Sequence, residues 1–504
     1  MKTSLLLFVI FASAASVRAD VKLPAILSDH MVLQADASVP IWGWAEPGEE
    51  VTVSFATQAK TTKADADGKW MVKLDKLKTG DAPQTLTVKG KNTLTVKDVL
   101  VGEVWLGSGQ SNMALNVGAV NHADEEIAAA KFPALRMFKV SSDATDTPQE
   151  DCQGSWQVCS PATVRLYSAT AYFFGRDLHQ KLGVPVGLIN SSVGGTRIES
   201  WISSEAQQKT PEVKAAADVL LKAAATYNAA GAKANYEKSV AKWQEAAAQA
   251  KAEGKEPPRA PSDPLAIRQK IGGVGGLFNG KIAPLIPYAL RGVVWYQGEA
   301  NSAPDRAVVY EYQLPALIAD WRARWGFEFP FAWVQLPNFD GGAVRDWPRM
   351  REAMLKTLKV KNTGMAIAID VGEANNIHPK NKQEVGRRLA LWALGTVYGQ
   401  KVPATSGPLP SGHEFRGGEV VLKFDHADGG LVAKDGELKG FLIAGEDKKW
   451  VSASAKIQGG EVIVSSPDVP KPAAVRYAWE NNPQCNLYNG AGLPASPFRT
   501  DDWK

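Results

Sequence analysis

A glycine-rich turn that holds a serine, Gly107-Ser-Gly-Gln-Ser-Asn-Met, carries the clearest chemistry in this sequence. It directly follows residues 99–106, an apolar run that is predicted to be a buried strand. Residues just after a parallel strand lie at the carboxyl edge of the sheet, where α/β proteins bind their ligands. The N–H groups of such a turn can also face an oxyanion. Ser111 is therefore a candidate nucleophile, although Gly-Gln-Ser-Asn alone is equally typical of an ordinary turn.

Three further segments have the same layout, in which a predicted strand ends in a loop that bears Gly, Asn or His. Parallel strands point the same way, so these loops are expected to gather at one edge of the sheet. An exposed serine, backbone-donor glycines, an amide side chain and a histidine are the groups that acyl transfer needs. The strand and loop pairs are 186–190 with 192–201, 292–296 with 297–301, and 365–370 with 376–379.

The strand and helix patterns divide the 504 residues into parts. Short alternating strands predict a β-sandwich in the first part, and strands return in the last. Between them, apolar strands alternate with helices, which predicts an α/β fold with a mainly parallel sheet and helices on both faces. The expected parts are a signal peptide (1–19), the N-terminal β-sandwich (20–98), the α/β domain (99–402) with a helical insertion at about 205–260, and a C-terminal β-rich domain (403–504).

The first residues have the layout of a secretory signal peptide. Lys2 precedes a short apolar run, and small residues lead to Ala19. The run is far shorter than the roughly 20 residues that cross a bilayer. The mature protein is therefore expected to begin near Asp20 and to be secreted or periplasmic, with no membrane insertion.

The insertion is rich in Ala, Lys and Glu from Pro211 to about residue 253. Tyr236, Val240 and Trp243 follow helical spacing, and Gly231 interrupts the pattern. A helical hairpin is expected. The hairpin either projects into solvent or covers the site as a lid.

Composition excludes several classes of function. A formal net charge of +4 with no block of basic residues gives no electrostatic footprint for nucleic acid. No metal-ligand spacing and no phosphate loop is present, so neither a metal nor another cofactor is expected.

Three cysteines are too few for a disulfide scaffold, although Cys152 and Cys159 can form a disulfide, which leaves Cys485 unpaired. The sequence does not define the oligomeric state.

Four blocks resemble those of the SGNH-hydrolase superfamily: Gly109-Gln-Ser-Asn, Gly194-Gly-Thr, Gln297-Gly-Glu-Ala-Asn and His378-Pro. Flanking segments, such as Ile377-His-Pro-Lys-Asn-Lys, are more similar still to the sialate O-acetylesterase family. The resemblance runs from about residue 23 to residue 502. It implies a serine carbohydrate esterase that acts on O-acetylated sugars, either 9-O-acetylated sialic acid or acetylated xylan or another polysaccharide.

The resemblance also implies a role for each residue of the blocks. Ser111 is the expected nucleophile, and its own N–H is one oxyanion donor. A glycine of the pair Gly194 and Gly195 supplies a second N–H, and the side-chain amide of Asn301 a third. His378 takes the serine proton and returns it to the leaving sugar oxygen. Further side chains of these loops are expected to bind the substrate, namely Gln110, Arg197, Trp201 and Gln297.

One position departs from the superfamily pattern. Many members place an aspartate three residues before the catalytic histidine, where this chain has Asn375. The acid that supports His378 is then Asp370, Glu299 or a backbone carbonyl, and Asp370 is preferred. Two other functions compete: a non-catalytic carbohydrate-binding protein, and a glycosidase that uses Glu299 and Asp370 as paired carboxylates.

Overall fold

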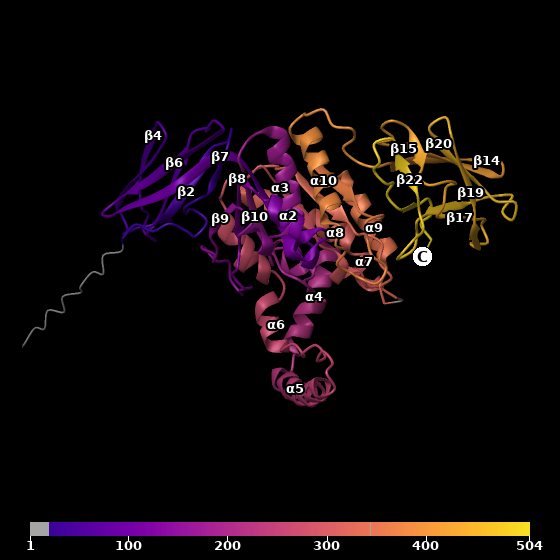
Figure 1. Cartoon of the computed structure of the whole chain (residues 1–504), viewed down its shortest axis with the longest axis horizontal. Helices are drawn as coiled ribbons and strands as arrows, with labels where there is room; N and C mark the ends of the chain where they lie inside the picture. The colour runs from indigo at the N-terminus through magenta and orange to yellow at the C-terminus, as the bar shows by residue number, and fades with distance from the viewer. Residues whose placement is uncertain (1–19, 343, 504) are drawn as a thin grey trace, which may run out of the picture.

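The computed structural model describes residues 20–342 and 344–503, so the leader expected over 1–19 lies outside the described residues. Figure 1 shows the N-terminal strands at one end of the molecule, the C-terminal strands at the other, and an α/β part between them. A helical arm projects from the α/β part. Among the described residues, no helix is both long and apolar enough to cross a membrane.

The central sheet confirms the predicted α/β fold. Six of its strands run parallel in the order β13-β12-β11-β7-β10-β8, and β9 pairs antiparallel with β8 at the edge. The strands β10 to β13 and the second part of β7 are almost wholly buried, as expected where helices cover both faces. Their bounds are β7 Thr93–Gly109, β8 Phe132–Lys139, β9 Trp156–Cys159, β10 Val186–Ser192, β11 Gly292–Tyr296, β12 Phe331–Gln335 and β13 Thr363–Ile367.

Tryptophan contacts show which helices cover which face of this sheet. Trp105 of β7 packs edge-on against Phe174 of α3 and Trp392 of α10. Trp295 of β11 points to the other face, where it packs against Trp321 of α8. The helices of the α/β part are α1 Ser111–Ala114, α2 Ala123–Ala129, α3 Ala169–Leu182, α7 Pro304–Ala307, α8 Tyr310–Trp325, α9 Trp347–Lys356 and α10 Lys382–Trp392.

Four of the six N-terminal strands are continuous with the central sheet, whereas β2 and β5 pair only with each other. The 17-residue strand β7 pairs with β6 and β1 in its first part and with β10 and β11 in its second. The domain boundary expected at residues 98 and 99 therefore lies inside one strand, and a single apolar core spans both sides of it. The remaining strands are β1 Val32–Gln34, β2 Val39–Trp44, β3 Glu50–Phe55, β4 Gln58–Lys63, β5 Lys69–Leu74 and β6 Gly80–Lys89.

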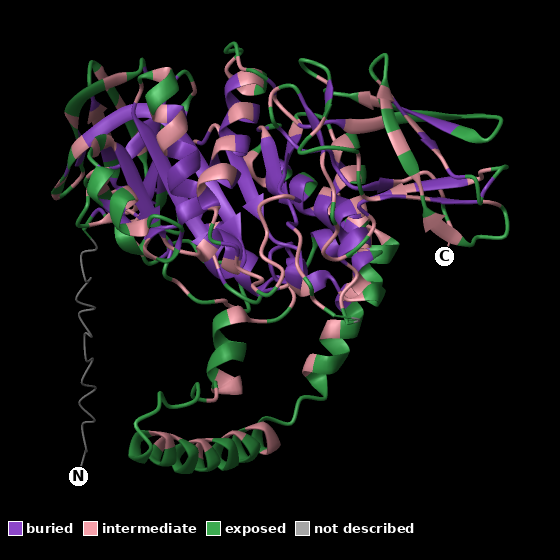
Figure 2. Ribbon diagram, turned by 45° about the vertical axis from the view of Figure 1, so that its right-hand side comes forward, coloured by how far each residue is buried: buried purple, intermediate pink, exposed green. Residues whose placement is uncertain are grey.

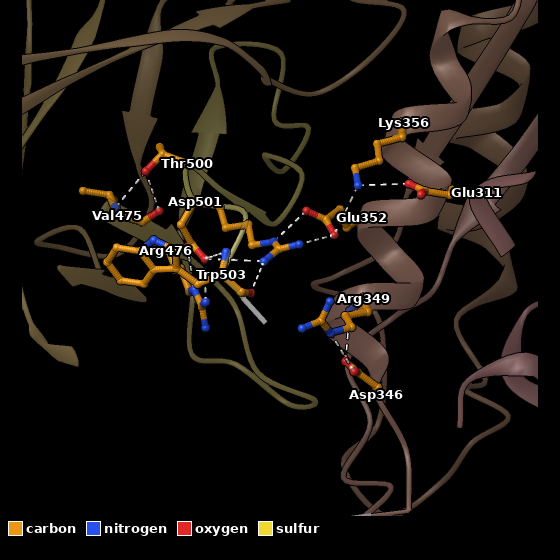
Figure 3. Close-up of polar contacts among 11 residues, drawn as sticks. Glu311, Asp346, Arg349, Glu352, Lys356, Val475, Arg476, Thr500, Asp501 and Trp503 are labelled. Atoms are coloured by element: carbon orange, nitrogen blue, oxygen red, sulfur yellow. Dashed lines mark hydrogen bonds and ion pairs between the residues drawn. The ribbon is translucent and has the colours of Figure 1, made fainter. Parts of the chain in front are cut away.

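The C-terminal strands form small sheets that are fastened to the α/β part through α9. Glu352 of α9 faces the C-terminal segment in Figure 3 and accepts two hydrogen bonds from Arg499, at 2.7 and 3.0 Å. Asp501, whose side chain is 1% exposed, accepts from Arg476 at 2.7 and 2.8 Å. The strands are β14 Leu409–Arg416, β15 Glu419–Asp425, β16 Leu431–Ala433, β17 Phe441–Ala444, β18 Trp450–Ser452, β19 Ser454–Gln458, β20 Glu461–Ser465, β21 Ala474–Tyr477, β22 Leu487–Asn489 and β23 Phe498–Arg499.

The expected insertion is the arm of Figure 1, built from α4 Pro211–Ala225, α5 Ala229–Ala252 and α6 Pro264–Ile271. Its helices are largely exposed, and α5 has no buried residue (Figure 2). The break between the first two helices lies at residues 226–228 rather than at Gly231, because Asn228 caps α5 by accepting from the Gly231 N–H.

The cysteines are free thiols. The pairing considered for Cys152 and Cys159 is thus not present. Both side chains are buried, and burial raises the pKa of each thiol to about 12. They act as small apolar residues of the core.

Candidate active site

Three of the four predicted loops meet where the strand order of the sheet reverses. Strand β7 lies between β10 and β11, so its carboxyl end is at the switch point where α/β sheets bind ligands. The Gly109 carbonyl accepts from the Val193 N–H at 3.1 Å, and the Gln110 N–H donates to the Tyr296 carbonyl at 2.9 Å. These bonds fix the serine turn to both neighbouring loops.

The fourth loop brings a histidine to Ser111. His378 lies between β13 and α10, and its Nε2 is 2.8 Å from Ser111 Oγ. This distance is within the range for direct proton transfer between a nucleophile and its base. Ser111 is the first residue of the short helix α1, and both side chains are partly exposed to solvent. The pair has the geometry of an activated serine.

Gly194 lies against the serine, and Gly195 follows it in the loop. A Cβ built on Gly194 would stand 3.3 Å from Ser111 Cβ, whereas one built on Gly195 would meet nothing. Both glycines are exposed, and neither N–H donates a hydrogen bond within the described part of the chain. The same holds for the Ser111 N–H. The loop can therefore present N–H groups to an oxyanion beside Ser111.

The turn before Ser111 needs glycine for two reasons. Gly109 has φ +135°, and a Cβ there would lie 2.2 Å from the Tyr296 carbonyl oxygen. We expect Gly109→Ala to combine strain with a backbone clash, each of which costs about 1–3 kcal/mol. Gly195→Ala is the matched control because φ is +75° but the space is open. Urea unfolding should give Gly109→Ala the lower midpoint; equal midpoints would contradict this account of the turn.

Comparisons with known proteins agree with this geometry. The family model described as "Carbohydrate esterase, sialic acid-specific acetylesterase" matches residues 101–254 and 281–394. The sialate O-acetylesterase of Mus musculus is 30% identical, with 94% of this chain and 93% of the relative covered. That of Homo sapiens is 32% identical, with 94% and 91% covered. The chain belongs to the sialic acid-specific acetylesterase family of carbohydrate esterases.

A solved structure supports the same assignment. The crystal structure of a carbohydrate acetylesterase from Xanthomonas citri is 36% identical and superposes with a TM-score of 0.82. The match covers 96% of this chain and all of that one. The protein is thus a carboxylic ester hydrolase that acts on O-acetylated carbohydrates. A binding protein without activity and a glycosidase, the two competing functions, are set aside.

The acid preferred for the triad does not contact His378 in this esterase. Asp370 accepts two hydrogen bonds from Arg388, at 2.6 and 2.9 Å, and a third from the Tyr488 hydroxyl at 3.1 Å. Both carboxylate oxygens are therefore engaged by a helix and by the C-terminal segment. The expected Asp370–His378 pair is corrected by this finding.

Glu299 does not contact His378 either. It is buried, and its Oε1 accepts from the side-chain amide of Asn112, while Oε2 has no partner among the described residues. Burial raises the pKa of this carboxyl group, against the opposing effect of the Asn112 hydrogen bond. Of the three acceptors considered, the structure brings none to His378 Nδ1 within its described residues.

Asn301 has a different position from the one expected of an oxyanion donor. Its side chain is fully buried, and its amide nitrogen donates to Glu199 at 2.9 Å. Its amide oxygen accepts from the Ile198 N–H at 3.0 Å and from Gln297 at 2.8 Å. Asn301 thus ties the glycine loop to the loop after β11, and a third donor to the oxyanion stays a prediction.

Gln110 and Gln297 hold loops together rather than line an open site. Gln297 is fully buried, and its amide nitrogen donates to Gln110 and to the Thr196 carbonyl, both at 3.1 Å. Gln110 Oε1 also accepts from the Ala300 N–H at 3.2 Å. Gln297 is therefore too deeply buried to contact a substrate, contrary to expectation. Gln110 is nearly as buried, at 3% exposure.

Trp201 cannot stack on a sugar. It is fully buried, its ring packs edge-on against Trp295, and its Nε1 donates to Thr196 at 3.0 Å. Its position in a loop beside the glycine pair suggested exposure, but the ring is part of the core.

Arg197 is the expected substrate residue that remains available. It is half-buried next to the exposed glycines, and its guanidinium makes no hydrogen bond or ion pair within residues 20–342 and 344–503. Burial and the nearby positive charge of Arg306 lower its pKa. An anionic or carbonyl group of a substrate would relieve this unfavourable environment.

Two buried residues near the pair were not singled out from the sequence. Asn112 directly follows Ser111, and Lys382 begins α10 four residues after His378; each is 0% exposed. Both stood inside blocks of the family resemblance, but lysine is almost never fully buried unless it is paired. Burial is the property that the sequence does not reveal.

The base has a lowered pKa. Partial burial and the positive charge of Lys382 both lower the pKa of His378 below its ordinary value. The lowered pKa favours the neutral imidazole, the form that can accept a proton from Ser111. No group of three or more metal-ligating side chains is present in the described part of the chain.

A cavity of about 740 Å³ lies away from this site. It lies between the N-terminal strands β2 and β5 and the α/β part, and none of the four loops contributes to its lining. Its lining includes Trp42, Trp44, Trp70, Phe278, Ile286 and Arg324.

Proposed function

We propose that this esterase hydrolyses the O-acetyl esters of sialic acids, 9-O-acetylated sialic acid first among them, with Ser111 as nucleophile and His378 as base. The 2.8 Å contact between Ser111 Oγ and His378 Nε2 carries the chemical part of this proposal. The relatives named sialate O-acetylesterase, which align over more than nine tenths of this chain, support the substrate.

In the first half of the reaction, His378 Nε2 accepts the proton of Ser111 as Oγ attacks the acetyl carbonyl carbon. The carbonyl oxygen becomes negative and is met by the N–H groups of Ser111 and of Gly194 or Gly195. One such donor contributes about 2.7–4 kcal/mol of transition-state stabilisation. The bond to the sugar oxygen then breaks, and His378 gives the proton to that oxygen.

In the second half, water attacks the acetyl group on Ser111. His378 takes a proton from the water, and the tetrahedral intermediate forms on the same N–H groups. Collapse of the intermediate breaks the bond to Ser111 Oγ, which recovers the proton from His378. The product leaves as acetic acid, which loses its proton to the solvent to give acetate, and the enzyme returns to its starting state.

Arg197 is proposed to bind the carboxylate of the sugar. Its guanidinium is half-buried and has no acceptor within the described residues, and Gly194 places the same loop against Ser111. A planar guanidinium can bind a carboxylate through two hydrogen bonds. Neutral acetylated polysaccharides such as xylan offer no such group.

Acetate release from a panel of substrates tests the proposal. The panel holds O-acetylated sialic acid, acetylated xylan and acetylated pectin, each with wild type, Ser111→Ala and Arg197→Met. We expect the highest kcat/KM on the sialic acid, and a loss by Arg197→Met on that substrate but not on an aryl acetate. Faster release from xylan, unaffected by Arg197→Met, would make the enzyme a polysaccharide acetylesterase instead.

The pH profile is expected to reflect the lowered pKa of His378. Only the neutral imidazole accepts the serine proton, and a lowered pKa keeps it neutral further into acid. Activity should therefore fall only as the pH drops below about 6.5, the ordinary histidine value. Measurement of kcat/KM for an aryl acetate from acid to alkaline pH tests this. An acid limb centred above neutrality would be inconsistent with the proposed base.

Export is proposed from the leader. Lys2, the short apolar run and the small residues up to Ala19 support cleavage by signal peptidase near Asp20. N-terminal sequencing of the exported protein should begin within a few residues of Asp20. An exported protein that retained Met1 would rule this out.

A further inference from the structure

The backbone around the catalytic histidine is held from both sides by two buried side chains. Asn112 Nδ2 donates to the carbonyl of Ile377, the residue before His378, at 2.9 Å. Lys382 Nζ donates to the carbonyl of Pro379, the residue after it, at 2.6 Å. Lys382 Nζ also donates to Asn112 Oδ1 at 2.8 Å, which joins the two contacts. We call Asn112 and Lys382 the histidine clamp.

The clamp is buried and makes several hydrogen bonds. Both side chains are 0% exposed, and the Asn112 carbonyl accepts from Thr170 Oγ1 at 3.1 Å. Glu299 accepts from the same Asn112 amide, and Lys382 Nζ lies 5.3 Å from the centre of the Tyr296 ring. Hydrogen bonds in such a buried environment are electrostatically stronger than in water. Because Asn112 directly follows Ser111, the clamp ties the nucleophile to the histidine loop.

A buried lysine is costly, so a structural reason alone explains it poorly. Replacement of buried ionic groups by apolar ones is often neutral or stabilising. Here both hydrogen bonds of the Lys382 ammonium go to the serine and histidine segments. Meanwhile the His378 imidazole, bonded to Ser111 through Nε2, has no acceptor for Nδ1 within the described residues.

We propose that Asn112 and Lys382 are positioning residues, which keep His378 in register with Ser111 in place of a carboxylate on Nδ1. In a serine triad the acid holds the imidazole in the correct orientation and tautomer. In this esterase the backbone on either side of His378 is fixed instead, which limits the positions that the ring can reach. This inference rests on the proposed roles of Ser111 and His378.

The charge of Lys382 gives the clamp a second, measurable effect. The groups that face Lys382 are Asn112 of α1, Tyr296 of β11, Glu299 of the next loop, and Glu373 and His378 of the loop before α10. Burial lowers the pKa of Lys382 to about 7, although Glu299 and Glu373 oppose this. Its positive charge in turn lowers the pKa of His378. Removal of that charge should raise the histidine pKa.

The test compares Lys382→Met with Lys380→Met on the full chain. Lys380 is exposed, lies in the same loop, and its side chain makes no hydrogen bond within the described residues. With an aryl acetate at alkaline pH, Lys382→Met should lower kcat about a hundredfold, as small misplacements do, with KM nearly unchanged. Its acid limb of kcat/KM should also move to higher pH. Lys380→Met should change neither value more than twofold.

Asn112→Ala separates position from charge. This variant loses the bond to the Ile377 carbonyl but keeps the Lys382 ammonium. It should lower kcat without raising the acid limb, and it serves as the main variant if Lys382→Met does not fold. Near-ultraviolet circular dichroism verifies the fold of each variant.

The outcomes distinguish the clamp from the proposed function. If folded Lys382→Met and Asn112→Ala keep more than half of wild-type kcat, and the acid limb does not move, the clamp is refuted. If Ser111→Ala retains full activity, the proposed function fails instead. The clamp is then judged by an NMR titration of the His378 ring, whose pKa should be higher in Lys382→Met than in wild type. An unchanged pKa refutes it.

Discussion

Ser111→Ala is expected to lower kcat on an aryl acetate by roughly 10⁶, the loss seen when a nucleophilic serine is removed from a working triad. The variant lacks the only atom that the proposed mechanism bonds to the acetyl group. Little structural change is expected, because Ser111 is partly exposed and its Oγ bonds to His378 alone among the described residues. Stopped assays for acetate with the two purified proteins give the ratio.

A matched control shows that the loss belongs to this serine. Ser141 follows β8 at the same edge of the sheet, and its Oγ donates to the Gln153 carbonyl at the surface. Ser141→Ala should keep wild-type turnover. A correctly folded Ser111→Ala that retained more than about a hundredth of wild-type kcat would remove Ser111 as the nucleophile, since a hundredfold loss is only ~2.7 kcal/mol.

The sequence predicted the strands and the loops well, because both depend on local patterns. The four apolar runs at 99–106, 186–190, 292–296 and 365–370 overlap four of the six parallel strands. The loops that follow β7, β10 and β13 contain Ser111, Gly194 and His378. Parallel direction alone places such loops at one edge. Residues 98 and 99, the expected domain boundary, lie inside β7. The alternating pattern before them and the fully buried pattern after them belong to this one strand.

Partners of side chains could not be predicted, because they come from distant parts of the chain. Asp370 lies between β13 and His378, yet its carboxylate is bound by Arg388, 18 residues later, and by Tyr488 of the C-terminal segment. Trp201 stands in a site loop but is covered by Trp295. The pattern of a loop shows which residues it contains, and packing decides which of them face the substrate.

His378→Ala is expected to be nearly as severe as Ser111→Ala, because the two residues act as a unit and the effects of such residues are not additive. Without the imidazole, Ser111 Oγ has no base within hydrogen-bond distance in the described residues. The double variant Ser111→Ala, His378→Ala should therefore be little worse than either single one. If His378→Ala kept a tenth of wild-type kcat, another group would be the base.

The same assay decides whether a carboxylate supports the base. Asp370 is held by Arg388 and Tyr488, so Asp370→Asn should retain more than about a tenth of wild-type kcat, a loss below ~1.4 kcal/mol. Its cost should appear in stability, since breaking a buried ion pair destabilises a protein by about 3–5 kcal/mol. A loss of about 10⁴ in turnover without a loss of stability would instead mark Asp370 as the acid.

Glu299→Gln completes the comparison, because it keeps the shape of the side chain and removes the charge. Its Oε1 accepts from Asn112, so the amide can still hold that end of the histidine clamp through its own oxygen. We expect only a modest fall in kcat, because the hydrogen bond from Asn112 is kept. A severe loss in Glu299→Gln, with Asp370→Asn still active, would assign the acid to Glu299. If Asp370→Asn and Glu299→Gln both stay active while His378→Ala is inactive, the orientation of His378 comes from the backbone that Asn112 and Lys382 hold.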